Sequence, residues 1–322
     1  MISLIYVPDP VVSLSIKPKK TDTKSLDTLS KALKRFAKED PTFVVKYDEE
    51  TEERTINGMG ELHLEIYAQR LEREYNVPIE LGRPKVVFYE TFVEGESFEY
   101  THKRQTGGRG QYGKAWGVLR PEYDPKKGNF EIIFKDNTTG NDLSKKYVPS
   151  IEKGFKEAAR VGPSAGKPVI GFRVELDGGQ EHMVDSSDFA FQYCGEGCMQ
   201  QIYNMIGTKV IGPVMKVQTS VPSKFSNAVV DLLSQRKGNI TNQDESLDYI
   251  TFDAEVALYD MFGYTADLRQ ITEGKGEYTM EFHQYDYVAE DLEEKLAEEN
   301  RLAILEAEKA KAEKSKKKKA GR

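Results

Sequence analysis

The stretch THKRQTGGRGQYGKAWGVLRP, residues 101–121, reverses the charge of the chain that surrounds it. The 322-residue chain carries 53 acidic and 46 basic side chains and a net charge of −7, whereas this window has several basic residues and no acidic one. Its glycines let the backbone approach another surface closely, and Tyr112 and the planar guanidinium of Arg109 can stack on bases. We therefore predict a flexible, RNA-contacting loop at the tip of a domain. The alternative is a solvated glycine-rich hairpin loop without a ligand.

Part of this stretch fits the pattern of a nucleotide-binding loop, because residues 108–114 read G-x-x-x-x-G-K. Such a loop needs Ser or Thr at the next position, whose hydroxyl binds Mg²⁺, and this chain has Ala115 there. It also needs an apolar strand before it and a helix after it. Here the preceding residues are polar, and the run that follows is short, strand-like and stopped by Pro121. The sequence therefore predicts no nucleotide site.

Length and composition limit the classes of protein to which this chain can belong. A chain of this length, with 38% hydrophobic residues, is long enough for two or three packed domains. The two cysteines, Cys194 and Cys198, provide no disulfide framework and indicate a reducing interior. They lie one turn apart on a predicted helix with no second pair, which favours buried thiols over zinc ligands. No apolar run approaches the roughly 18 residues of a membrane span, and no signal or transit peptide is visible.

Hydrophobic periodicity predicts two units of one type on either side of a central region, each with the element order β-α-β-β-α-β of a ferredoxin-like fold. The first unit is predicted from strands at 12–16, 43–47, 54–57 and 77–81 and helices at 26–36 and 64–75. The last is predicted from strands at 215–221, 249–256 and 278–282 and helices at 227–235 and 261–271. The central region is predicted to hold strands at 86–100, 129–134 and 169–176 and helices at 147–161 and 188–205.

Isolated histidines give weak signals of chemistry. His63 lies at the start of the 64–75 helix, and a surface or capping role is favoured over a functional one because no second His follows at i+4. His182 is close in sequence to Asp185 and Ser186, which are the residue types of a hydrolase triad. No strand-turn nucleophile elbow frames the serine, so a triad is not expected.

The C-terminal segment, residues 291–322, is rich in Glu, Lys and Ala and ends in a run of lysines. Leu292, Leu296 and Ile304 are too sparse to predict a core. We expect a solvated helix that frays into a disordered basic tail and is dispensable for folding, with an RNA or membrane-surface anchor as the alternative.

Several long motifs resemble one family. The segment NGMGELHLEIY (57–67) resembles domain III of translation elongation factor G. Two further segments, QTGGRGQYG (105–113) and HMVDSSDF (182–189), resemble its domain IV. The segments MFGYTADLR (261–269) and GKGEYTM (274–280) resemble its domain V. The resemblance runs from about residue 8 to residue 287, and the sequences of the motifs are most similar to those of the mitochondrial branch of the family.

The resemblance implies an α+β fold, with two ferredoxin-like split βαβ domains flanking a central α/β domain of the ribosomal-protein-S5-like type, plus a charged helical tail. The expected domains are 1–82 (domain III-like), 83–210 (domain IV-like, with basic tip loops), 211–287 (domain V-like) and 288–322 (tail). The family begins with a GTPase domain and a β-barrel domain that this chain lacks. GTP and Mg²⁺ are therefore expected in that missing part, with no cofactor, metal or catalytic residue in this chain.

By the same resemblance, the chain is expected to bind the ribosome, through the rRNA of both subunits and the tRNA–mRNA duplex, and to promote translocation when joined to a GTPase domain in cis or in trans. The protein is expected to be a monomer in the mitochondrial matrix and not to bind a membrane. A non-enzymatic ribosome-binding factor for assembly or stalling, or a ribosome-recycling G factor, remains the alternative. The residues that would contact the tRNA–mRNA duplex in the decoding centre are Gln105, Gly107, Gly108, Arg109, Gly110, Gln111, Tyr112, Gly113, His182, Asp185 and Ser186. We expect the loops at 105–113 and 182–187 to lie side by side, with Gly110 at positive φ.

Overall fold

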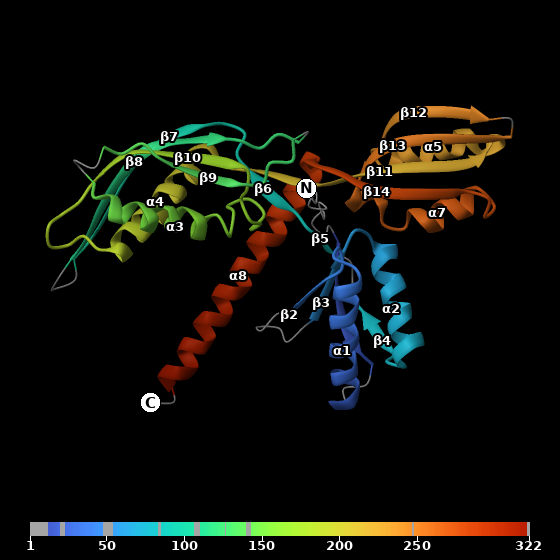
Figure 1. Cartoon of the computed structure of the whole chain (residues 1–322), viewed down its shortest axis with the longest axis horizontal. Helices are drawn as coiled ribbons and strands as arrows, with labels where there is room; N and C mark the ends of the chain where they lie inside the picture. The colour runs from blue at the N-terminus through green and yellow to red at the C-terminus, as the bar shows by residue number, and fades with distance from the viewer. Residues whose placement is uncertain are drawn as a thin grey trace, which may run out of the picture. The chain divides into compact units, whose positions relative to one another are not determined.

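The computed structural model describes residues 12–19, 23–47, 54–82, 85–105, 110–125, 127–139, 143–246 and 248–320. The chain forms two compact units (Figure 1). One contains the described residues up to Val87 together with Gly212–Gln284, and the other contains Phe88–Ile211 and the described residues from Tyr285 onward. No helix in the described ranges is long and apolar enough to cross a membrane.

The first unit contains an antiparallel sheet with the strand order β2-β3-β1-β4, and β5 also pairs with β1. Its central strand buries Val12, Leu14 and Ile16, as their alternation predicts. The helices bury Leu29, Leu33, Phe36, Leu64 and Leu71. The elements are β1 Val12–Pro18, α1 Thr23–Glu39, β2 Val44–Tyr47, β3 Arg54–Gly58, α2 Glu61–Tyr75, β4 Ile79–Leu81 and β5 Lys85–Val86. The predicted β-α-β-β-α-β order is confirmed.

A second sheet has the order β12-β13-β11-β14. The prediction missed β12 because its sequence, NITNQDES, is polar and almost wholly exposed, so that no alternation marks it as a strand. The helix predicted at 261–271 is two helices, because Gly263 adopts a φ of 78° between them. The elements are β11 Lys209–Pro222, η2 Ser223–Phe225, α5 Ser226–Gln235, β12 Asn239–Ser246, β13 Tyr249–Ala257, α6 Leu258–Met261, α7 Tyr264–Ile271 and β14 Glu277–Tyr287.

The second unit is built on a sheet of order β7-β8-β10-β9, in which only the β9–β10 pair is parallel among the described pairings. Helices α3 and α4 cover the same face of this sheet (Figure 1) and enclose a core that includes Phe98, Phe155, Phe172 and Phe191. The elements are β6 Tyr89–Thr91, β7 Glu96–Arg104, β8 Gln111–Pro121, β9 Ile132–Asp136, η1 Lys145–Tyr147, α3 Val148–Ala158, β10 Phe172–Gln180 and α4 Asp188–Ile206.

Most of the basic stretch is strand rather than flexible loop, which corrects the prediction. Strand β7 continues to Arg104 and β8 begins at Gln111, so only the residues between them connect the two strands. The glycines that suggested flexibility include Gly113, which is buried within β8. A Cβ atom at Gly113 would lie 3.2 Å from the Phe191 ring, so glycine here permits close packing.

Helices α3 and α4 cross at a pair of glycines. A Cβ atom at Gly154 would overlap the carbonyl oxygen of Gln192, and one at Gly195 would overlap that of Ile151. Because the obstacles are backbone atoms, no rotamer change can relieve the overlap. Glycine at these two positions therefore sets the distance between the helices.

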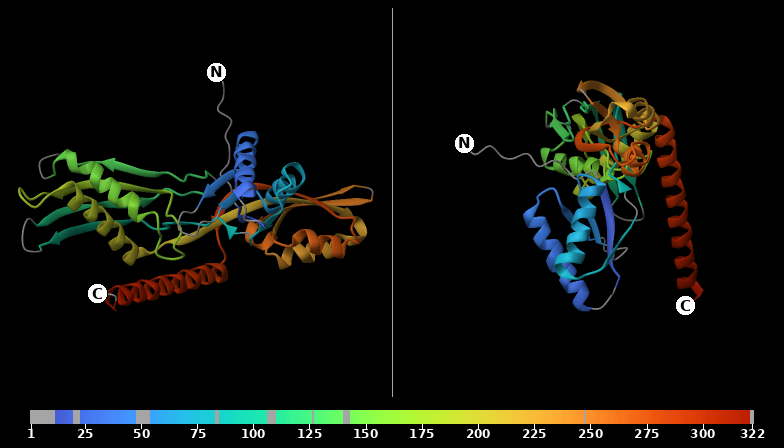
Figure 2. Two further views of the ribbon diagram at one scale, coloured as in Figure 1. Left: turned by 90° about the horizontal axis from the view of Figure 1, so that it is seen from below. Right: turned by 90° about the vertical axis from the view of Figure 1, so that its right-hand side faces the viewer.

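The C-terminal helix α8 (Glu290–Ala320) is a single continuous helix (Figure 2). Its first turns pack against the second unit: Leu292 and Leu296 are each only 8% exposed. Glu293 accepts hydrogen bonds from the Val210 backbone N–H (3.2 Å) and from Lys209 Nζ (3.1 Å). Asn300 donates to the Ser164 carbonyl at 3.2 Å. The expectation that Leu292 and Leu296 are too sparse to contribute to a core is therefore wrong.

Leu296→Ala is expected to lower the free energy of unfolding of the second unit by about 2 kcal/mol, because a buried leucine is truncated. The matched control is Leu305→Ala on the same helix, where the side chain is 45% exposed and a change within about 0.5 kcal/mol is expected. Chemical denaturation followed by circular dichroism measures both. Equal, small effects of the two changes would mean that α8 does not dock in solution.

Candidate nucleic-acid interface

The two predicted tip loops meet at one end of the second unit, and Asp185 joins them. Its Oδ1 accepts the Gly110 backbone N–H at 2.9 Å, and its own carbonyl accepts the Tyr112 N–H at 3.0 Å. The Ser186 hydroxyl donates to the Tyr112 carbonyl at 2.8 Å and accepts the His182 N–H at 2.8 Å. The expected juxtaposition of the loops is confirmed for these residues. Gly107, Gly108 and Arg109 lie outside the described residues.

Gly110 is constrained by proximity rather than by backbone torsion, which corrects the expectation of a positive φ. It is not among the described glycines with a left-handed φ. A Cβ atom there would lie 3.1 Å from Asp185 Cγ and 3.2 Å from its Oδ2. A larger residue at position 110 would therefore push against the carboxylate that ties the loops together.

The predicted contact residues divide into inward-facing and outward-facing groups. Gln111 Oε1 accepts a hydrogen bond from His102 Nε2 at 3.0 Å, and Gly113 packs on the core. Gln105 is exposed. The Tyr112 hydroxyl donates to Gln180 Oε1 at 2.9 Å, and its ring centroid lies 6.0 Å from that of His182. Gln105, Tyr112 and His182 are thus the described side chains best placed to meet a ligand.

The backbone of its own loop favours one tautomer of the neutral His182 ring. Its Nδ1 lies 3.4 Å from the Val184 backbone N–H and 3.3 Å from that of Asp185, which favours Nδ1 as an acceptor, and Asp185 Oδ2 lies farther away, at 3.6 Å from the same nitrogen. In the neutral ring the proton is then on Nε2, which is free to donate to a phosphate or a 2′-hydroxyl. Ser186 is buried and its hydroxyl is bound to backbone groups, so these residues do not form a hydrolytic triad.

Three family descriptions match successive parts of the chain. They are Elongation Factor G, domain III, at residues 7–83, Elongation factor G, domain IV, at residues 84–205, and Elongation factor G C-terminus at residues 209–296. The chain belongs to the elongation factor G family. The resemblance identified from the motifs and the α+β fold class expected from it are both confirmed.

Individual relatives agree with this assignment. The chain is 46% identical over 295 residues to "Elongation factor G, mitochondrial" of Culex quinquefasciatus, and 44% identical over 292 residues to the protein of that name from Drosophila melanogaster. These matches include 92% and 91% of this chain but 39% of each relative, so the chain spans about two fifths of their length. A crystal structure of a Thermus thermophilus protein matches with a TM-score of 0.68 and 33% identity, over 93% of this chain and 44% of that one.

In this elongation factor G chain, His63 is a capping residue, as the sequence favours. Its Nδ1 accepts the Met59 backbone N–H at 3.2 Å, and its Nε2 lies 2.9 Å from Asp40 Oδ2. Burial opposes ionisation of Asp40, but hydrogen bonds from Thr42, His63 and Tyr67 outweigh it and lower the pKa of the carboxyl. These contacts tie the end of α1 to the start of α2, which is a structural role.

The two cysteines are buried free thiols, as predicted. Burial raises the pKa of the Cys198 thiol well above its usual value, and the neighbouring Cys194 adds to the effect. Cys198 is therefore a poor nucleophile, and burial keeps both thiols from solvent. Within the described part of the chain, no group of His, Cys, Asp and Glu side chains is arranged to hold a metal ion.

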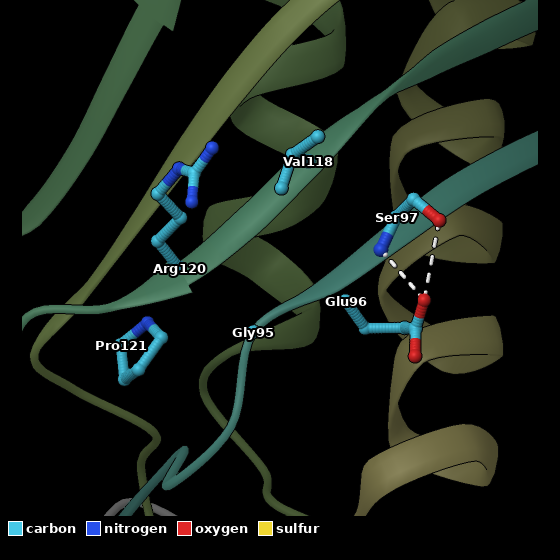
Figure 3. Close-up of a pocket in the computed structure, with 6 residues that line it drawn as sticks. All are labelled: Gly95, Glu96, Ser97, Val118, Arg120 and Pro121. Carbon is cyan, nitrogen blue, oxygen red and sulfur yellow. Dashed lines mark hydrogen bonds between the residues drawn. The ribbon is translucent and has the colours of Figure 1, made fainter.

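A shallow hollow at the opening of the β7–β8 pair offers no catalytic chemistry (Figure 3). Glu96 Oε1 accepts the N–H and the hydroxyl of Ser97 at 2.8 and 3.2 Å. Arg120 Nε donates to Glu175 Oε2 at 3.4 Å. The polar groups in the hollow are thus bound to one another or to a neighbour, with no base positioned to activate a nucleophile. The lining residues are Gly95, Glu96, Ser97, Val118, Arg120 and Pro121.

Proposed function

We propose that this chain is the ribosome-binding, translocating part of a mitochondrial-type elongation factor G. It would act with a GTPase module, which supplies GTP and Mg²⁺ chemistry. The observation that carries the proposal is the tip itself, where Asp185 holds the Gly110 and Tyr112 backbone against the His182 loop. Residues held in this way suit insertion into a site of fixed shape, because they lose less conformational freedom on binding.

The chemistry of the tip suits a groove of RNA. Double-stranded RNA is recognised mainly by shape and by contacts to 2′-hydroxyl and phosphate groups. The His182 Nε2–H group and the Tyr112 ring stand at the tip, and exposed basic side chains of β7, Lys103 and Arg104, lie just behind it. We infer that this end of the chain contacts the tRNA–mRNA duplex in the decoding centre of the small subunit, while the flanking domains contact the rRNA of both subunits.

The domain boundaries at 82, 210 and 287 stand as proposed limits of the domain III-like, domain IV-like and domain V-like parts. The names of the relatives support a mitochondrial location, and we place the protein in the matrix as a monomer. We assign no catalytic role to the chain on its own.

His182→Ala, in a chain joined to the GTPase module of a relative, is expected to slow translocation by about fivefold or more, because one hydrogen-bond donor to RNA is lost. GTP hydrolysis on the ribosome should change by less than about twofold, since the substitution is remote from that chemistry. The assays are fluorescence-detected movement of mRNA and release of phosphate. His283→Ala is the matched control, because His283 is also partly exposed but lies on β14.

An equal loss of both activities would mean that the tip acts through GTPase activation. Normal translocation by the variant would remove His182 from the proposed site. A joined wild-type chain that binds ribosomes without moving mRNA would favour a role in recycling or assembly.

A further inference from the structure

Several large apolar side chains are exposed next to the tip. Met183 is fully exposed, Phe189 is 70% exposed and Tyr193 is 47% exposed. Phe189 and Tyr193 are four residues apart on α4, so they lie on the same face of the helix. Single exposed hydrophobic residues are ordinary, but a group of them bordered by polar residues marks an interaction surface.

The Tyr193 ring is fixed in place by β7. Its centroid is 5.5 Å from that of His102, with an angle of 29° between the rings, so the two are stacked. His102 is itself fixed by the 3.0 Å hydrogen bond from Nε2 to Gln111 Oε1. His102 of β7 and Tyr193 of α4 therefore form an aromatic pair that is oriented before any ligand binds.

The surroundings of the aromatic pair are basic. Alternation along β7 places Arg104 on the same face as His102. Arg104 and Lys103 are exposed, and neither forms an ion pair with a described residue. Two carboxylates also lie at this end of α4: Asp185 accepts the Gly110 N–H, and Asp188 Oδ1 lies 3.4 Å from the Ser150 hydroxyl. This end of α4 thus combines exposed planar rings with two exposed cationic side chains of β7.

We propose that His102, Phe189 and Tyr193 form a stacking surface for unpaired RNA bases, with Arg104 binding the adjoining phosphate. The inference deepens the proposed function and rests on it, in that the tip works on RNA. Exposed aromatic rings beside a basic groove are the usual means of binding single-stranded RNA, since every base has a π-face. Planarity and positive charge together favour RNA over an apolar protein partner. In this arrangement Gln111 is a positioning residue that acts through His102.

The test measures binding of a fluorescently labelled, short single-stranded RNA to the full chain by anisotropy. The Phe189→Leu, Tyr193→Leu double variant keeps apolar surface but removes the rings. Its Kd should rise by at least about fivefold, the lower end of the effect of losing one base–aromatic stack. Phe189→Tyr keeps a ring and should bind within about twofold of wild type. Tyr249→Leu is the matched control, because Tyr249 is 50% exposed but lies on β13.

Failure of this inference can be told apart from failure of the proposed function by cosedimentation of the same variants with ribosomes. Unchanged RNA affinity of the double leucine variant, or no RNA binding by the wild-type chain, overturns the stacking surface whether or not ribosomes are bound. Ribosome binding that survives leucine but not serine at positions 189 and 193 would indicate apolar docking on protein, and would also overturn it. RNA binding lost with the rings, in a chain that does not bind ribosomes, would support the stacking surface while refuting the proposed function.

Discussion

Gly195→Val is expected to destabilise the second unit by about 3 kcal/mol or more, which is a large share of the roughly 5–15 kcal/mol by which domains are usually stable. The Cβ position at Gly195 overlaps the Ile151 carbonyl oxygen, and Gly154 of the facing helix is in contact as well. Relief requires α3 and α4 to move apart. That movement would open the core between Ile151, Phe155 and Met199, all of which are fully buried. Overpacking against backbone therefore also creates cavities elsewhere.

Thermal and urea denaturation of the full chain, followed by near- and far-ultraviolet circular dichroism, measure this effect. The matched control is Gln200→Val, which introduces the same β-branched residue at an exposed position of α4 and should change stability by no more than about 0.5 kcal/mol. A loss at Gly195 as small as at Gln200 would show that the helices do not cross as closely as the structure indicates.

Asp185→Ala is expected to have the largest effect on function, reducing ribosome affinity by about tenfold or more. The substitution removes an ionised acceptor from the Gly110 N–H, and hydrogen bonds to charged groups are worth about 1.5–3 kcal/mol. Without that bond the Gly110 end of the first loop is released, although the bonds of Tyr112 to the Asp185 carbonyl and the Ser186 hydroxyl remain. The released segment must be ordered again on binding. Global stability should fall by less than the cost of a core substitution, because the loops lie outside the core.

Cosedimentation with ribosomes at several salt concentrations measures this loss. Asp177→Ala is a suitable control, since Asp177 is a carboxylate on β10 that also accepts a hydrogen bond, from Asn137 Nδ2 at 3.1 Å. Its loss should leave affinity within about twofold, because it does not join the loops. Equal affinities of the Asp185 and Asp177 variants would mean that loop pairing plays no part in binding.

The elements with a regular hydrophobic pattern could be predicted from the sequence, and those shaped by close packing could not. Alternation at Val12, Leu14 and Ile16 predicted β1 because one side of that strand is buried. β12 has no buried side to produce such a pattern. Gly113 suggested mobility, but a Cβ atom there would lie 3.2 Å from the Phe191 ring. Glycine occurs in mobile loops and in tightly packed strands alike, and sequence does not separate the two.

The location of the candidate site could also be predicted, but the directions of its side chains could not. The motifs placed both loops at one tip, and the bonds of Asp185 confirm this. Gln111 and Gly113 belong to the same motif, but Gln111 faces His102 and Gly113 faces the core. The reason is that strand β8, with its alternating side chains, begins inside the motif. The signal for Phe189 and Tyr193 was present as large apolar residues at the start of α4, but only the fold reveals that they are exposed.

The most direct test of the central claim, that the paired loops enter the small-subunit decoding site, is cleavage of rRNA from a probe attached to the tip. Cys194 and Cys198 are fully buried, so Met183→Cys would provide a single accessible thiol at a fully exposed position of the second loop. An iron–EDTA group attached there generates hydroxyl radicals that cut nearby RNA when the protein is bound to mitochondrial ribosomes. We expect cuts confined to the small-subunit rRNA around the decoding site, and their loss when Asp185→Ala is added. Cuts elsewhere on the ribosome, with the decoding site intact, would contradict the account.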